Sequence, residues 1–531
     1  MTTLLGQSLL AGSLGAPGGA VFHAVNPATG AKLAPDFHEA SLPEVDVALA
    51  AAASAFEVYR LVPAETRAKL LEAIATEIEA LGDALLARAH AETGLPMTRL
   101  TGERARTCGQ LRLFAAVVRE GSWVDARIDP ALPDRQPLPR PDLRRMLIAL
   151  GPVVVFGSSN FPFAFSVAGG DTASAFAAGC PVIVKAHRAH AGTAELVGRA
   201  VVRAVASLGL PAGLFSLVHG GGATVGIAMV KHAAVAAVGF TGSHAAGRAL
   251  CDAAAARPHP IPVFAEMSSL NPVFLLPGAL RARGAAIATG LVGSFTLGVG
   301  QFCTKPGLVF ALRGADTDAF LQKFSEAVRG AACATMLTPG IRTAFLENRD
   351  RVTAVPGVTA LAAATAPADA AKTEAQPSVA VTTAARFLAH PALATEAFGP
   401  FTLVILAESP AELTACARAL EGQLTATLLG EADELAAAAS LVALLELKAG
   451  RLVVNAFPTG VEVCHAMHHG GPSPAASDAR FTSVGTAALL RFARPVCYQS
   501  FPAALLPPAL QDANPLGLMR LVNGARTAAP L

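Results

Sequence analysis

The chain has 531 residues, a length that suggests two or three domains. Its 53% hydrophobic and 15% charged residues favour a folded, oligomer-forming enzyme over a disordered chain. The formal net charge is only +2 and no long basic run occurs, which argues against a nucleic-acid partner.

The eight cysteines are scattered without paired spacing, and the amino-terminal sequence lacks the pattern of a signal peptide. We therefore expect reduced thiols and a cytoplasmic protein. Residues 146–170 carry no charge, and their length alone would allow a membrane helix. Prolines and glycines interrupt this stretch, so we expect no membrane span.

Helical periodicity dominates the early part of the chain. Residues 1–40 hold glycine and proline with little periodicity, and 25–30 read as a turn. From residue 43 to about 121 the pattern is helical, with Ser41 as a plausible N-cap and breaks at Pro63 and Pro96.

Between residues 145 and 271 strand-like and helix-like runs alternate, which predicts a parallel, doubly wound sheet with its ligand at the carboxyl ends of the strands. Strands are expected at 153–156, 182–185, 214–218, 234–240 and 263–266, separated by helices at 166–179, 192–207, 224–232 and 244–257. Residues at or after the strand ends are then candidates to contact one ligand: Asn160, Lys185, His219, Thr241 and Glu266.

A second α/β domain is expected after about residue 270. Its strands are predicted at 308–312, 378–382, 402–406, 425–429 and 451–455, and its helices at 281–298, 316–330, 410–420 and 431–446. Residues 125–145 are rich in Pro and Arg and are not expected to form core. Residues 356–377 are expected to form a surface excursion, and the tail from 494 to 531 is apolar but aperiodic.

Three stretches carry the residue types of a covalent acyl-transfer site. Cys303 follows two glycines and precedes Lys-Pro, so it lies in a loop. Glu266 lies in an apolar strand, where burial is expected to raise its pKa and suit it to general-base work. Asn160 supplies a lone amide in an apolar loop. Taken singly, each also has a structural interpretation: a buried thiol, a carboxylate paired with a buried cation, and a turn cap.

These stretches, together with Phe-Thr-Gly-Ser-His-Ala-Ala-Gly at 240–247 and Glu-Ala-Phe-Gly-Pro at 396–400, resemble the aldehyde dehydrogenase superfamily from about residue 20 to about 500. Residues 101–112, 185–190 and 458–467 resemble the branch of 2-oxoglutarate semialdehyde dehydrogenases and bacterial NADP-dependent fatty-aldehyde dehydrogenases. The resemblance implies an α/β fold: a Rossmann-type parallel-sheet cofactor domain (1–124 and 146–266), an α/β catalytic domain (267–455), and oligomerisation segments (125–145, a hairpin, and 480–531). A homodimer or tetramer is expected.

The resemblance also implies roles for individual residues. Cys303 would be the nucleophile, Glu266 the base that activates water, and Asn160 an oxyanion donor. The cofactor would contact Lys185, His187, Arg188, Gly222, Gly242, Ser243, Gly247, Glu396 and Phe398. Taken alone, the Gly220-x-Gly222-x-x-x-Gly226 spacing misses the usual dinucleotide motif by one residue and equally fits a plain helix start.

Substrate recognition is expected from the arginine helix at 101–112 and from residues near the entrance of the substrate site. Arg104 and Arg112 lie close to one helix face and Arg106 well off it. A solvated or salt-bridged face is the alternative for these arginines. Arg104, Arg112, Gln301 and His465 are the substrate candidates.

The expected reaction oxidises an aldehyde to a carboxylic acid through a cysteine thiohemiacetal and thioester. The leading substrate is 2-oxoglutarate semialdehyde, with medium or long-chain fatty aldehydes as the alternative. A coenzyme-A-acylating enzyme is a third possibility, but it would not need Glu266. Cys464-His465-x-x-His468-His469 has zinc-ligand residue types, but no second ligand cluster accompanies it, so no metal is expected.

The cofactor is expected to be NADP, with NAD as a second choice. NAD-preferring members of the family commonly place a glutamate three residues after the ribose-binding lysine, and here that position is Arg188. A cation there would attract the 2′-phosphate. The alternative is that Arg188 points into solvent and sets no strong bias.

Overall fold

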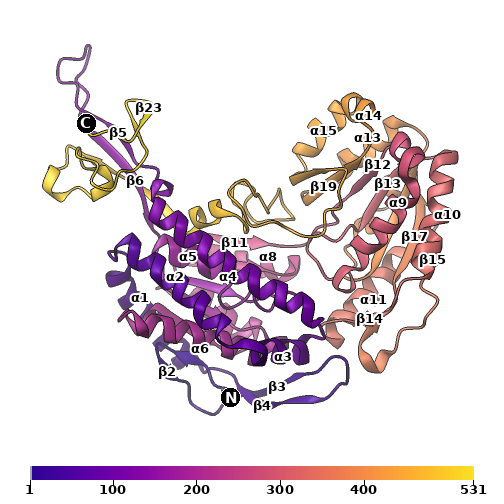
Figure 1. Cartoon of the computed structure of the whole chain (residues 1–531), viewed down its shortest axis with the longest axis horizontal. Coiled ribbons are helices and arrows are strands. Elements are labelled where there is room, and N and C mark those ends of the chain that lie inside the picture. Colours follow the sequence, from indigo (N-terminus) through magenta and orange to yellow (C-terminus); the bar gives the residue numbers. More distant parts are fainter. Residues whose placement is uncertain (1–2) are drawn as a thin grey trace.

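The computed structural model describes residues 3–531 and contains two seven-stranded sheets in separate lobes and a five-stranded sheet at one end (Figure 1). The amino-terminal helices cover the first lobe, as predicted. Ser41 caps the first of them in a capping box with Glu44, and Pro63 and Pro96 directly precede the second and fourth. These helices are α1 (Leu42–Tyr59), α2 (Ala64–Glu79), α3 (Gly82–Thr93) and α4 (Met97–Glu120). A hairpin of β3 (Val21–Val25) and β4 (Lys32–His38) precedes them.

The first sheet has the order β11-β10-β7-β8-β9-β1-β2, and its first five strands are parallel. Alternate residues of the strands enter different cores: Val153 and Val155 pack with α2 and α4, whereas Val154 and Phe156 pack with α1 and α8. Helices therefore cover both faces, which confirms the doubly wound prediction. The elements are β7 (Val153–Phe156), α5 (Gly170–Ala178), β8 (Val182–Lys185), α6 (Ala191–Ser207), β9 (Phe215–Val218), a π-turn (Gly222–Gly226), α7 (Ile227–Lys231), β10 (Ala237–Thr241), α8 (His244–Ala255) and β11 (Val263–Glu266), with β1 (Leu9–Leu10) and β2 (Ser13–Leu14) antiparallel at the edge.

The second sheet has the order β15-β17-β18-β13-β12-β19-β20. The predicted strands are all present. The predicted surface excursion at 356–377 includes β15 (Thr359–Ala363), an antiparallel edge strand that is largely exposed. The other elements are β12 (Val273–Leu275), α9 (Pro277–Thr296), β13 (Leu308–Leu312), α10 (Ala315–Arg329), α11 (Pro339–Thr353), β17 (Ser378–Thr383), β18 (Phe401–Ala407), α13 (Pro410–Ala419), β19 (Gln423–Leu429), α14 (Ala432–Ala437), α15 (Ala439–Glu446) and β20 (Ala449–Val454).

The third sheet combines two strands from residues 127–149 with three strands from residues 493–527. A loop between β5 and β6 projects from this sheet (Figure 1). Residues 125–145 do contribute to a small core, contrary to expectation: Ile128 is fully buried against Leu506 and Leu510. Buried arginines organise the tail, since Arg520 donates to backbone carbonyls of the tail and Arg144 pairs with Asp512. Apolar periodicity could not reveal such a polar network. The strands are β21 (Ala493–Gln499), β6 (Leu143–Ala149), β5 (Arg127–Asp129), β22 (Arg520–Val522) and β23 (Ala525–Thr527).

One helical stretch of the described residues, 277–300, is long and apolar enough to cross a membrane by length and composition alone. Its inward residues Ile287, Leu291 and Phe295 pack on the second sheet and α10. The charge-free stretch at 146–170 forms strands and a loop, not a long helix.

Candidate active site

Cys303 lies in a loop directly after α9. That helix ends in a tight turn in which Gly298, Val299 and Gly300 all have positive φ. A Cβ on Gly300 would lie 2.2 Å from the carbonyl oxygen of Gly399, so only glycine fits this turn. The turn ends the helical stretch at Gly300, and the loop that carries Cys303, here called the thiol loop, follows it.

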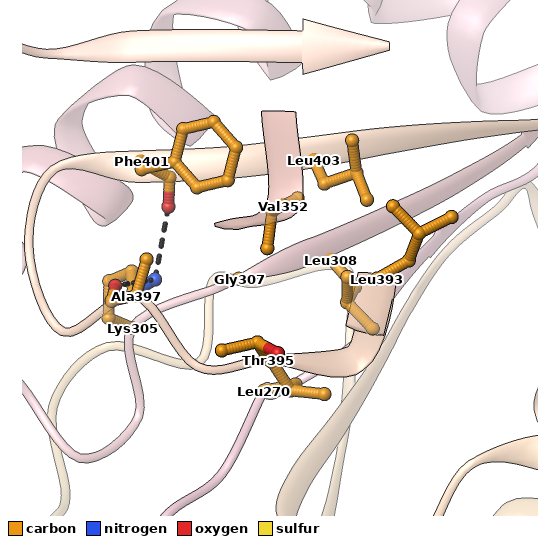
Figure 2. A pocket seen from close by; sticks show the side chains of 10 residues that line it. All are labelled: Leu270, Lys305, Gly307, Leu308, Val352, Leu393, Thr395, Ala397, Phe401 and Leu403. Carbon is orange, nitrogen blue, oxygen red and sulfur yellow. Dashed lines mark hydrogen bonds between the residues drawn. The ribbon is translucent and has the colours of Figure 1, made fainter. Parts of the chain in front are cut away.

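Two side chains hold the thiol loop in place. Asn271 Nδ2 donates to the carbonyl oxygens of Cys303 (2.8 Å) and Lys305 (3.0 Å). The Lys305 ammonium donates to the carbonyl oxygens of Ala397 and Phe401, each at 3.0 Å, as Figure 2 shows. Burial lowers the pKa of Lys305 to about 8, against the opposing charge of Glu396. These bonds connect the thiol loop to the segment between β11 and β12 and to the loop at 396–401.

The predicted nucleophile and base meet, and a histidine joins them. Cys303 Sγ lies 3.3 Å from His469 Nε2, and the same nitrogen lies 3.0 Å from Glu266 Oε1. The hydroxyl of Ser483 donates to the other carboxylate oxygen of Glu266. Both contacts of His469 use one nitrogen, so the ring holds the carboxylate and the sulfur together and does not relay a proton between its two nitrogens.

The electrostatics of this cluster differ from the expectation based on burial alone. Burial raises the pKa of Glu266, but the His469 imidazole and the Ser483 hydroxyl outweigh it, and the pKa of Glu266 is lowered. Burial and the charge of Glu266 together raise the pKa of the Cys303 thiol well above its ordinary value. In the resting site the carboxylate is therefore charged and the thiol protonated.

Asn160 also reaches the thiol loop. Its Nδ2 donates to the carbonyl oxygen of Gln301 at 3.0 Å, two residues before Cys303. Arg99 of α4 donates to the Asn160 carbonyl oxygen at 2.7 Å and stacks between the rings of Phe161 and Phe302. The amide is buried and held against the thiol loop, and its role as an oxyanion donor stays a prediction.

The helix α4 faces the site with a different arginine from those predicted. Arg112 forms a bidentate pair with Glu79 on the surface, and Arg104 donates to the carbonyl oxygen of Gly82, so both were wrong as substrate candidates. Arg106 instead lies over the ring of Phe165, 5.4 Å from its centroid, and its buried Nη1 has no partner among the described residues. Burial lowers the pKa of Arg106, against the charges of Glu103, Cys303 and Glu266.

Two further substrate candidates have other contacts. Gln301 is buried, its Oε1 accepts from the Leu337 N–H at 3.0 Å and its Nε2 donates to Gly298, so it supports the loop and cannot face a substrate. His465 is exposed and lies 3.2 Å from the Thr486 hydroxyl, and its role at the mouth stays a prediction.

The strand ends of the first sheet carry polar groups without partners. The Thr241 hydroxyl and both ring nitrogens of His219 are buried and have no hydrogen bond within residues 3–531. Lys185 ends β8, and burial alone lowers the pKa of its ammonium to about 8. Ser243 caps the exposed amino terminus of α8, where Gly247 allows contact with Met267: a Cβ there would lie 2.6 Å from the Met267 sulfur. Gly222 opens the π-turn after β9. Unpaired donors beside a helix amino terminus fit a dinucleotide with an anionic pyrophosphate.

Arg188 is not free. It forms an ion pair with Glu39 and lies over the ring of Phe22, 5.0 Å from its centroid. Glu39 also accepts from the Gly221 N–H at 3.4 Å, so the pair borders the glycine turn after β9. His187 caps the following turn through Nδ1, and burial lowers its pKa well below the ordinary value, so it offers no charge to a phosphate.

Glu396 and Phe398 lie on the loop that Lys305 anchors, and both are half-buried. Burial raises the pKa of Glu396, opposed by Lys305 and by hydrogen bonds to Ser268 and Ser269. A partly buried carboxylate next to the thiol loop is suited to accept from ribose hydroxyls.

The aldehyde dehydrogenase family matches residues 16–478, which span the thiol, the base and the strand-end residues. The chain belongs to this family. An α-ketoglutaric semialdehyde dehydrogenase of Azospirillum brasilense is 56% identical over 524 residues, 98% of each chain. Another from Acinetobacter baylyi is 48% identical over 492 residues, covering 92% of this chain and 93% of that one.

Solved structures of other proteins share the fold. PnpE from Pseudomonas sp. WBC-3 has a TM-score of 0.78 at 23% identity, covering 94% of this chain and 98% of that one. A betaine aldehyde dehydrogenase from Staphylococcus aureus, in complex with NAD+, has a TM-score of 0.79 at 20% identity, covering 94% and 98%. These likenesses concern the fold, whereas the family match identifies the chain as an aldehyde dehydrogenase, a class that uses NAD(P).

Four residues of this aldehyde dehydrogenase site escaped sequence reasoning: His469, Ser483, Arg106 and Asn271. His469 was visible only as one histidine of a Cys/His-rich run, and no spacing pointed from it to Cys303. Arg106 could have been found by noting that Arg99, Glu103 and Arg106 recur at helical spacing. Ser483 gives no sequence signal.

Proposed function

We propose that this aldehyde dehydrogenase oxidises 2-oxoglutarate semialdehyde to 2-oxoglutarate. The observation that carries the proposal is the buried, unpartnered Nη1 of Arg106, whose guanidinium is close enough to Cys303 and Glu266 for their charges to interact. A guanidinium with an unused donor suits the distal carboxylate of a short semialdehyde. The two semialdehyde dehydrogenases that match nearly the full chain support the same substrate.

We assign the first chemical step to Cys303, Glu266 and Asn160. The Cys303 sulfur adds to the aldehyde carbon, and its proton passes to Glu266 and then to solvent. The Asn160 amide and the Cys303 backbone N–H donate to the alkoxide oxygen of the thiohemiacetal, and each such donor contributes roughly 3–4 kcal/mol. A bound nicotinamide supplies the hydride acceptor, held by Glu396 and Phe398.

The second step hydrolyses the thioester. Glu266, again a carboxylate and held by His469 and Ser483, removes a proton from the attacking water. The Asn160 amide stabilises the second tetrahedral oxygen, Cys303 leaves as a thiolate, and the acid is released. His469 Nε2 donates to Cys303 or to Glu266, depending on which carries the negative charge. This hydrogen bond lowers the free energy of the state in which a thiolate lies beside a carboxylate.

Replacing the base separates the two steps. Glu266→Gln is expected to give a burst of reduced cofactor about equal to the enzyme present, followed by slow turnover, because deacylation needs the base. Cys303→Ala is expected to abolish both phases while cofactor binding, followed by quenching of nicotinamide fluorescence, persists. Normal burst and steady-state rates in the glutamine variant would assign water activation to another group.

A fatty aldehyde is the second candidate substrate, favoured by an apolar cluster of Phe161, Phe165, Val461, Val463 and Met467 beside the site. The two substrates make opposite predictions for specificity. We expect kcat/KM to be higher for 2-oxoglutarate semialdehyde than for decanal, measured in stopped-flow assays at saturating cofactor. The reverse order would assign the apolar cluster to a long acyl chain.

We further propose that NADP is preferred over NAD. Lys185 and Arg188 supply positive charge near the ribose end of the site, and charge-assisted bonds contribute roughly 1.5–3 kcal/mol each. Glu39 already holds Arg188, so the preference is expected to be moderate. A 2′-phosphate must compete with that carboxylate for the guanidinium.

The pair Arg188 and Glu39 allows a matched test. Arg188→Glu is expected to reverse or abolish the NADP preference, whereas Glu39→Gln is expected to increase it about tenfold by freeing Arg188. The ratio of kcat/KM for the two cofactors measures both. Equal ratios in the parent and in both variants would show that neither residue contacts the cofactor.

We also propose a cytoplasmic homodimer or tetramer with domain limits of 1–124 and 146–266, 267–455, and assembly segments 125–145 and 480–531. All eight cysteines are free, which supports a reducing compartment. Only 28% of the apolar window within 277–300 consists of residues that are buried in one chain. The outward residues of this helix are mostly small. A helix of this kind is suited to a subunit contact.

A further inference from the structure

The cluster around Cys303 contains three residue types that bind zinc. Cys303 Sγ, His469 Nε2 and a Glu266 carboxylate oxygen all lie within 4.8 Å of one another. In the sequence, no second group of zinc-ligand residue types accompanies the run from Cys464 to His469. The fold instead brings only the last histidine of that run to a thiol and a carboxylate from distant positions, as described above.

The two distances from the His469 nitrogen to the other ligand atoms are close to those of a tetrahedral site. With Zn–S of about 2.3 Å, Zn–N of about 2.0 Å and Zn–O of about 2.1 Å, the sulfur-to-nitrogen edge is about 3.5 Å and the nitrogen-to-oxygen edge about 3.3 Å. The corresponding separations here are 3.3 Å and 3.0 Å. An ion therefore needs these two edges to widen by only a few tenths of an ångström, and it needs the sulfur-to-oxygen separation, which lies within 4.8 Å, to be about 3.6 Å.

The surroundings also suit a single bound oxygen of Glu266. Ser483 donates to the Oε2 atom, which leaves Oε1 directed at the other two ligands. His469 and Glu266 are buried, whereas Cys303 is only half-buried, so an ion can arrive from the sulfur side. Three protein ligands and one open position are the arrangement of zinc sites that keep a water or substrate as the fourth ligand.

We propose that Cys303, His469 and Glu266 bind one thiophilic divalent cation such as Zn²⁺ when no aldehyde is present, and that this ion reversibly blocks the enzyme. The thiol loses its proton to solvent on binding, so one thiolate and one carboxylate neutralise the two positive charges. The proton of His469 Nε2 moves to Nδ1, so the imidazole binds through Nε2 as a neutral ligand. The sulfur lone pair that would attack an aldehyde is then occupied by the metal. The inference is independent of the proposed substrate.

Two features set the strength of the site. His469 Nδ1 has no hydrogen-bond partner in the described part of the chain, whereas histidine ligands of tight zinc sites usually donate from the second nitrogen. The guanidinium groups of Arg106 and Arg451 are close enough to interact with Cys303, and they disfavour a cation. We therefore expect an exchangeable ion that chelators remove, not a permanent structural metal.

Cobalt titration of the full chain, without aldehyde or cofactor, tests the site directly. Binding of Co²⁺ is expected to produce a saturable sulfur-to-cobalt absorption band at one equivalent, which added Zn²⁺ displaces. Cys303→Ser is expected to lose the band, and His469→Asn to weaken cobalt binding about tenfold or more. The matched control is the double variant Cys464→Ser, His465→Asn, which removes the neighbouring thiol and histidine and is expected to keep the band.

A band that persists in Cys303→Ser, or that disappears in the double variant, would overturn the assignment. A second measurement needs no variant. Zn²⁺ is expected to slow alkylation of Cys303 by iodoacetamide, read by mass spectrometry of its peptide, and EDTA is expected to restore the rate. Unchanged alkylation of Cys303 at saturating Zn²⁺ would equally overturn the proposal. Neither readout depends on turnover, so failure here is distinguishable from failure of the proposed reaction.

Discussion

Cys303 and Glu266 lie close together, and the negative charge of the carboxylate disfavours ionisation of the thiol. The lowered pKa of Glu266 keeps the carboxylate ionised, and its charge adds to burial in raising the pKa of the thiol. A protonated sulfur is a poor nucleophile toward adventitious electrophiles. Activation must then occur when the aldehyde arrives and the proton can move to Glu266.

The sign of this coupling is testable by alkylation. Glu266→Gln removes the neighbouring negative charge, lowers the pKa of Cys303 and increases its thiolate fraction at any fixed pH below that pKa. We expect iodoacetamide to label Cys303 faster at pH 8 in the variant than in the parent, even though the variant turns over more slowly. In the parent, the labelling rate should keep rising above pH 9, the ordinary pKa of a thiol.

Cys497, which is exposed on β21, provides an internal control in the same digests. Its labelling rate should be equal in the two proteins. Slower or unchanged labelling of Cys303 in the glutamine variant would mean that the carboxylate does not set the reactivity of the thiol.

At the scale of elements, α4 is the helix that links the site to the amino-terminal layer. One face carries Arg99, Glu103 and Arg106 toward the thiol loop, and Glu103 accepts from the Phe163 and Ala164 N–H groups at 2.9 and 3.0 Å. The opposite side carries Arg112, paired with α2. A single helix thus offers two arginines of the same chemistry with different surroundings.

Those two arginines give a matched pair of variants. Arg106→Gln is expected to lower kcat/KM for 2-oxoglutarate semialdehyde about tenfold to a hundredfold, because one charge-assisted interaction with the distal carboxylate is lost, and to leave decanal within about threefold. Arg112→Gln is expected to leave both values unchanged and to cost about 1 kcal/mol of stability or less. Equal losses for both aldehydes in the Arg106 variant would assign it to the architecture of the site.

Hydrophobic periodicity was sufficient to predict ten of the fourteen strands of the two large sheets, because buried parallel strands are continuous apolar runs between turn residues. The short strands β1, β2 and β12 and the exposed edge strand β15 were not predicted. Cys303, Glu266 and Asn160 were predicted to share one site because each lies in a distinctive local stretch, and the structure brings all three to one place. His469 and Ser483 were not predicted, because they contact Glu266 across 203 and 217 residues. The choice of Arg104 and Arg112 failed because spacing alone does not tell which helix face is inward.

At the scale of the whole molecule, one face of α9 in the second lobe stays exposed in a single chain. On α9 the outward residues Ala282, Ala286, Thr289 and Gly293 are exposed and small, and Leu297 follows with 48% of its surface accessible. Small side chains allow a second backbone to approach closely. This surface is therefore expected to form a contact between subunits in addition to the assembly segments 125–145 and 480–531.

A large charge on that surface should separate the subunits. Ala286→Arg is expected to shift the mass measured by size-exclusion chromatography with light scattering toward the monomer, because a guanidinium buried in an apolar contact has no partner. Ala436→Arg, on an exposed position of α14, serves as the control and should keep the parent mass. An unchanged mass in the α9 variant would place the subunit contact elsewhere.

The long sequence separation within the catalytic cluster has a consequence for the chain while it is being made. Cys303 and His469 are 166 residues apart, so at ribosomal rates of roughly 5–20 residues per second the thiol emerges about 8 to 33 seconds before the histidine. Ser483 follows later still. A stalled or prematurely released chain carries the cysteine without the groups that position its base, and the reactive centre is assembled only once translation of the enzyme is nearly finished.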